Sequence, residues 1–176
     1  MPLESVKLPA SLKKVIERKI KKLLAQDVFF GPTVETPYRA GFCLHMQVVP
    51  RGQVKSLQFG KPEGIRVLLE NKNNVLAAVD FRKTPSGRLK ISNIHQGKGL
   101  TKVLDTLNQL EKMLATAKQV WEPELIFFLL SPVPYIKIKS GKKVEFLKLE
   151  KGKIKKVTPI SIKKEIATAV NSHQSS

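Results

Sequence analysis

Two segments of the chain carry apolar residues at the three- and four-residue spacing of an amphipathic helix. In residues 9–26 the apolar stripe lies opposite a row of basic residues, and Pro9 and Ser11 are suitable residues for a helix start. The second stripe, in residues 99–118, consists of Leu100, Val103, Leu104, Leu107, Leu110, Met113 and Leu114. We also expect a short helix at about residues 160–170 and a disordered tail at residues 171–176.

Short apolar runs separated by turn-forming residues predict strands between and after the two long helices. A loop at residues 31–37 is followed by expected strands at residues 42–49, 54–59, 65–70, 75–82 and 88–94. Turns at residues 71–74 and 84–87 should join the last three of these into a meander. A buried strand at residues 125–130 and two or three lysine-rich strands within residues 135–157 complete the pattern.

These elements predict an α+β fold in one domain of residues 1–170. In this fold an antiparallel sheet carries helices packed on one face. No repeat of the solenoid kind is present.

The charge of the chain indicates the class of partner. Thirty-two Lys and Arg stand against 14 Asp and Glu, which gives a net charge of +18 on 176 residues. Such a charge attracts polyanions, so nucleic acid is the first candidate partner, an anionic membrane surface the second and an acidic protein the third. Nearly all the positive charge is lysine, which senses phosphate rather than base identity. We therefore expect contacts with the phosphate backbone and little sequence specificity. The sequence indicates no preference between DNA and RNA.

The sequence also favours a cytoplasmic protein. Cys43 is the single cysteine, so no internal disulfide forms. The N-terminus does not resemble a signal peptide, and the longest apolar run, residues 125–130, is too short for a transmembrane segment.

Two basic segments are candidate nucleic-acid-binding surfaces. One is the lysine tract of residues 135–156, in which Tyr135 could stack on a base. The other is the polar side of the first helix. The candidate residues are Tyr135, Lys137, Lys139, Lys142, Lys143, Lys153, Lys155 and Lys156 in the tract, and Lys14, Arg18, Lys21 and Lys22 in the helix.

Three residues are candidates for catalysis. Cys43 and His45 are two apart on a predicted strand and therefore share a face, as a nucleophile and its base would. His45 and His95 are also the residues that a metal-free ribonuclease would use as base and acid. We expect no metal site, because Cys and His residues at zinc-binding spacing are absent and Glu70 and Asp80 have no acidic partner at nuclease spacing.

His95 precedes a glycine-flanked turn that should open the second long helix. The backbone N–H groups of Gly97, Lys98 and Gly99 are candidates for anion or cofactor binding at the start of that helix. The turn Gln96–Thr101 resembles the acetyl-CoA-binding turn of the GNAT acyltransferase family, whose pattern is Gln/Arg-x-x-Gly-x-Gly/Ala; Thr101 occupies the last position. The order of elements in residues 65–130 is similar to that family as well. The resemblance implies acyltransferase activity with acetyl-CoA as cofactor.

The leading hypothesis is a nucleic-acid-binding domain without a cofactor. The alternatives are a small enzyme, either GNAT-like or a ribonuclease, and an effector-type protein-interaction module.

Overall fold

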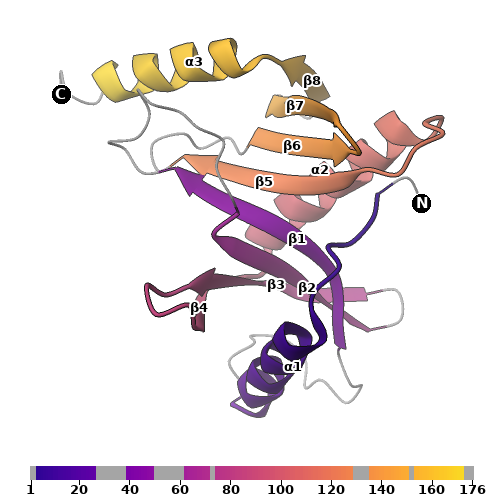
Figure 1. Cartoon of the computed structure of the whole chain (residues 1–176), viewed down its shortest axis with the longest axis vertical. Coiled ribbons are helices and arrows are strands. Elements are labelled where there is room, and N and C mark those ends of the chain that lie inside the picture. Colours follow the sequence, from indigo (N-terminus) through magenta and orange to yellow (C-terminus); the bar gives the residue numbers. More distant parts are fainter. Residues whose placement is uncertain are drawn as a thin grey trace. The chain divides into compact units, whose positions relative to one another are not determined.

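The structure is a computed structural model and describes residues 3–26, 39–49, 62–71, 74–128, 135–150 and 153–172. The described residues form three helices and eight strands (Figure 1). In chain order these are α1 (Ala10–Ala25), β1 (Arg39–Val49), β2 (Gly64–Asn71), β3 (Asn74–Lys83), β4 (Leu89–His95), α2 (Lys98–Leu114), β5 (Glu122–Phe128), β6 (Tyr135–Ser140), β7 (Lys143–Glu150), β8 (Lys153–Val157) and α3 (Pro159–Ser172). The predicted α+β fold on a mostly antiparallel sheet is confirmed.

Hydrogen bonds between neighbouring strands give the order β4-β3-β2-β1-β5-β6-β7-β8. The β1–β5 pair is parallel, with His45 opposite Glu124 and Val49 opposite Phe128. Parallel pairing needs a long connection, and the segment from β2 through α2 lies between these two strands in the chain.

The described chain divides into two compact units. The α1 unit comprises Ser5–Leu44 and Gly64–Leu104, and the α3 unit comprises Met1–Glu4, His45–Glu63 and Asp105–Ser176. Strand β1 and helix α2 each contribute residues to both units.

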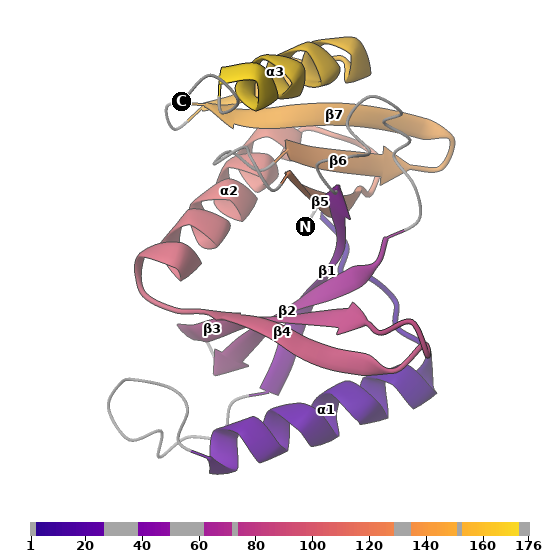
Figure 2. The ribbon, with the colours of Figure 1, turned by 90° about the vertical axis from the view of Figure 1, so that its left-hand side faces the viewer.

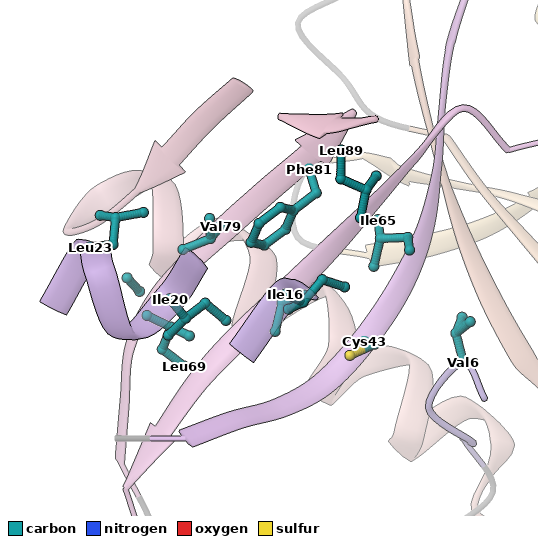
Figure 3. Packing of buried hydrophobic residues seen from close by; sticks show 12 residues of the cluster. Val6, Ile16, Ile20, Leu23, Cys43, Ile65, Leu69, Val79, Phe81 and Leu89 are labelled. Carbon is teal, nitrogen blue, oxygen red and sulfur yellow. The ribbon is translucent and has the colours of Figure 1, made fainter. Parts of the chain in front are cut away.

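In the α1 unit, helix α1 packs on one face of the β2–β4 meander (Figure 2). Ile16, Ile20 and Leu23 are the buried residues of α1. Figure 3 shows these side chains next to apolar residues of the strands, among them Leu69 and Phe81. Three residues of the apolar stripe of α1 are therefore part of the core, and the polar side of the helix remains at the surface.

In the α3 unit, helix α3 packs on the β6–β8 strands. Ile162 and Ile166 of the helix lie in a buried cluster with Ile126 and Tyr135 of the strands. The helix begins with a reciprocal cap, because the N–H of Ser161 donates to Thr158 Oγ1 at 3.1 Å and the N–H of Thr158 donates to Ser161 Oγ at 3.1 Å. Pro159 suits the first helical position, which needs no hydrogen bond from its nitrogen.

Several predicted boundaries can be compared with the structure. The predicted meander and its turn at Thr84–Gly87 are confirmed, with the N–H of Gly87 donating to the carbonyl of Thr84 at 2.8 Å. Helix α2 ends at Leu114, four residues before the predicted end. Helix α3 extends to Ser172, so the start of the predicted tail is helical. The predicted loop at 31–37 and strand at 54–59 lie outside the described residues.

Candidate nucleic-acid interface

The outer side of α1 presents unpaired positive charge. Lys14, Arg18, Lys21 and Lys22 are all exposed, as is Lys13. Within the described residues none of these five cations forms an ion pair. Glu17 is the only exposed acidic side chain in the described part of the α1 unit. The helix therefore carries a local excess of positive charge, and no carboxylate of the described residues forms an ion pair with these cations.

The cations of α1 are also evenly spaced. Lys14, Arg18 and Lys22 are four residues apart, so they lie along one side of the helix. A rise of about 1.5 Å per residue separates their Cα atoms by about 6 Å along the axis. These three residues form a row of positive charges that runs along α1 at an incline to the helix axis.

The lysine tract of β6–β8 has a different electrostatic character. Five of its lysines contact a glutamate. These are Lys137 with Glu124 at 3.0 Å, Lys143 and Lys156 with Glu145 at 3.0 and 2.8 Å, Lys148 with Glu165 at 2.6 Å, and Lys155 with Glu150 at 2.8 Å. Lys156 and Lys143 lower the pKa of Glu145 by hydrogen bonding, and Glu150 raises the pKa of Lys155 in the same way. The tract is thus largely a lysine–glutamate network.

Three candidate residues of the tract have no ion pair among the described residues. Lys139, Lys142 and Lys153 are exposed and free of carboxylate contacts. They are the positive charges that the β6–β8 strands offer to a partner.

Tyr135 is not available for stacking on a base, contrary to the sequence-based expectation. Its side chain is 1% exposed, and its hydroxyl donates to Glu165 of α3. Burial and the hydrogen bond to this carboxylate raise the pKa of the phenol. Lys148 donates to the other oxygen of the same carboxylate, so Tyr135 and Lys148 together fix α3 to the sheet.

Cys43 has the environment of a structural cysteine. Its side chain is buried, and its Sγ lies 3.5 Å from the carbonyl oxygen of Gly41. Burial raises the pKa of the thiol, whereas a nucleophilic cysteine needs a lowered one. His45, two residues on, belongs to the α3 unit, where it lies opposite Glu124 in the β1–β5 register.

His95 lies in a cluster that the sequence analysis did not identify. Its Nε2 is 2.9 Å from Asp80 Oδ2 and 2.8 Å from Arg66 Nη2. Arg66 also donates to both oxygens of Asp80, at 2.6 and 2.9 Å, and both side chains are buried. Burial opposes ionisation of Asp80, but the hydrogen bonds and charges of Arg66 and His95 outweigh it and lower the pKa. The carboxylate is therefore ionised, next to a partly exposed histidine.

Three consecutive strands bring this cluster together. Arg66 lies opposite Asp80 in the β2–β3 register, and His95 is at the end of β4. The signal in the sequence was the presence of Arg66 and Asp80 within the apolar runs of β2 and β3, where a charge is costly unless it is paired. The structure gives Asp80 an arginine and a histidine as its partners.

The glycine turn after His95 forms the start of α2. Gly97 has a φ of 53°, which favours glycine, and Lys98 is the first helical residue. The carbonyl of Gly97 accepts from the N–H of Thr101 at 3.0 Å and from its hydroxyl at 3.2 Å. Lys98 is exposed beside this helix start.

In the described ranges no group of three His, Cys, Asp or Glu side chains is arranged to hold a metal ion. None of the helices in the described residues is long and apolar enough to cross a membrane. Comparison of the chain with models of known protein families, with curated proteins and with solved structures finds no match.

Proposed function

We propose that this protein binds nucleic acid through the phosphate backbone, with the outer side of α1 as the main contact surface. The observation that supports this proposal is the row of exposed cations at Lys14, Arg18 and Lys22, which form no ion pair with any residue that the structure describes. A regular row of cations suits the regular charges of a phosphate backbone. Lys139, Lys142 and Lys153 are secondary candidates on the other unit.

The packing of α1 argues against a membrane surface as the partner. An interfacial helix must insert its apolar face among lipids. The apolar residues Ile16, Ile20 and Leu23 are buried in the protein core. These residues cannot insert among lipids, and the exposed side of α1 is charged, which favours an anion that is bound from outside.

The test is fluorescence anisotropy with labelled single-stranded RNA and duplex DNA over a salt series. One variant replaces Lys14, Arg18 and Lys22 by Gln, and a matched control replaces Lys143, Lys155 and Lys156 by Gln. Both variants lose three positive charges, but the control residues are engaged by glutamates. We expect the α1 variant to reduce the log–log salt slope by roughly two to three units, and the control variant to change it by less than one unit.

Two outcomes contradict the proposal. Equal effects of the two variants would show that total charge, not α1, determines binding. Absence of binding by the unmodified protein at physiological salt would remove nucleic acid as the partner and favour an acidic protein.

A second candidate function is acid–base chemistry at His95, as in the ribonuclease hypothesis. The contact of His95 Nε2 with the ionised Asp80 supports it, because a carboxylate can orient a catalytic imidazole. Gel analysis of the RNA recovered from the binding experiment tests this function. Cleavage that a His95→Ala variant lacks would assign it, and intact RNA would contradict it.

A further inference from the structure

A groove lies beside the cationic row, between α1 and the beginning of β1. Its volume is about 530 Å³, which is within the usual range for ligand sites. Lys13, Glu17 and Lys21 of α1 form its charged edge. The apolar part of the lining comes from Ile20, Leu24, Ala40 and Gly41. All these residues belong to the α1 unit.

A carboxylate lies next to this groove at Gly41. A side chain at Gly41 would overlap the carboxyl group of Glu70, so this group occupies the space that the glycine leaves open. Glu70 Oε1 accepts a hydrogen bond from the N–H of Phe42 at 3.0 Å. Glu70 makes no other hydrogen bond among the described residues, so its Oε2 can accept one from a ligand. A β-bulge between Leu69 and Glu70 interrupts the strand alternation at this point.

The groove thus offers three kinds of contact within one unit. Lys13 and Lys21 are point charges for phosphate, and the apolar lining suits the face of a planar ring. The carboxyl group of Glu70, which lies against Gly41 of the lining, is a hydrogen-bond acceptor beside the groove. An unstacked nucleotide presents the matching groups: an anionic phosphate, an aromatic base and, in cytosine, adenine and guanine, an exocyclic amino group.

We propose that the groove receives an unstacked base of a single-stranded nucleic acid, with Glu70 accepting a hydrogen bond from the exocyclic amino group. This inference rests on the proposed function and adds a substrate class to it. Single strands bind better than duplexes, because a duplex keeps its bases stacked and its amino groups paired. Cytosine binds better than uracil, because uracil carries a carbonyl oxygen where cytosine has the amino group.

The experiment compares labelled oligocytidine, oligouridine and a duplex of the same length by anisotropy at one fixed salt concentration. Because the two single strands carry the same phosphates, a difference between them reports on the base. We expect oligocytidine to bind about tenfold more tightly than oligouridine, and the duplex to bind more weakly than oligocytidine.

The key variant is Glu70→Gln. Its amide oxygen can still accept from the N–H of Phe42, while its NH₂ group donates where a carboxylate oxygen accepted. We expect the cytidine-to-uridine affinity ratio to fall to about one or below. A residue that only supports the fold would weaken both probes equally and leave the ratio unchanged.

A second pair of variants tests the groove itself. Ala40→Phe fills it, and Ala167→Phe makes the same change at an exposed position of α3 in the other unit. We expect only Ala40→Phe to remove the preference for single strands over the duplex, with the salt slope kept. A retained preference in Ala40→Phe would overturn the inference.

The outcomes separate this inference from the function on which it rests. Steep salt dependence with equal affinity for all three probes would refute base binding in the groove and leave phosphate binding by α1 intact. An unchanged cytidine-to-uridine ratio in Glu70→Gln would refute the role of Glu70. Failure of all probes to bind would refute both proposals.

Discussion

At the scale of single residues, the most constrained charge in the described chain is Asp80. It holds the buried Arg66 through two hydrogen bonds and also contacts His95. Replacing Asp80 by Asn takes the carboxylate away from a guanidinium that stays buried. We expect the free energy of unfolding to fall by about 3–5 kcal/mol, as for other broken buried ion pairs. Urea denaturation followed by circular dichroism measures this loss.

The matched control for Asp80→Asn is Glu145→Gln. This change breaks the contacts of Glu145 with Lys143 and Lys156, whose side chains are largely exposed. Exposed pairs contribute little, so the expected loss is less than about 1 kcal/mol. Similar losses for both variants would show that the Arg66–Asp80 pair does not behave as a buried one.

The carboxylate of Asp80 also leads us to expect a loss of stability at acidic pH. The pKa of Asp80 is lowered from its ordinary value of 3.8, so the folded state prefers the ionised form. The stability from this preference is present above pH 3.8 and is lost as the pH falls through the folded-state pKa. The unmodified protein should therefore lose more stability between pH 5 and pH 2 than Asp80→Asn does, as measured by urea midpoints over this range.

At the scale of elements, the contact between the Glu70 side chain of β2 and the backbone of β1 depends on Gly41. Its φ is not in the positive range, so backbone conformation does not require glycine there. The carboxyl group of Glu70 requires glycine at position 41, because the methyl group of an alanine would displace this carboxyl group from the N–H of Phe42. We expect Gly41→Ala to lower the free energy of unfolding by about 1–2 kcal/mol through this lost hydrogen bond.

A double-mutant cycle with Glu70→Ala tests this explanation. Without the carboxyl group, the alanine at position 41 meets no obstacle and should cost clearly less. Urea denaturation of the two single variants and the double variant gives the coupling energy. The same cost of Gly41→Ala in both backgrounds would mean that something other than Glu70 limits this position.

The elements themselves could largely be predicted from the sequence, because they depend on local periodicity. The apolar stripe of α1 and the alternation of apolar and polar residues in the meander can each be recognised within a short segment of the sequence. Their partners could not be predicted in this way. Arg66, Asp80 and His95 come together only through the pairing of three strands, and Glu165 reaches Lys148 only because α3 packs on β7.

The candidate interface shows the same limit. The charges along the chain favoured residues 135–156 as the binding surface, because Glu145 and Glu150 are the only acidic residues of that segment. The fold adds Glu124 from β5 and Glu165 from α3 to the same strands. The number of lysines along the chain therefore overestimated the free charge of the tract. It also gave no sign that the cations of α1 have no ion pair within the described part of the chain.

At the scale of the whole molecule, the net charge of +18 is distributed unevenly. On α1 the cations repel one another, with Glu17 as the nearest counter-charge on the same helix. On β6–β8 most lysines attract a glutamate. Salt screens both effects. It should therefore stabilise the α1 surface and weaken the ion pairs of the tract.

The two triple variants designed for the binding test separate these effects. Replacing Lys14, Arg18 and Lys22 by Gln relieves repulsion, so we expect higher stability than the unmodified protein at low salt. Replacing Lys143, Lys155 and Lys156 by Gln removes attractive contacts, so we expect lower stability under the same conditions. Both differences should shrink as salt is added, and urea denaturation at low and high NaCl measures them.

The two variants carry the same net charge. A shift of stability in the same direction for both would therefore mean that total charge, and not the placement of acidic residues around the lysines, governs stability. Opposite shifts would show that the glutamates of β7 neutralise the lysines they contact, while α1 keeps its charge at a cost in stability that a bound polyanion would remove.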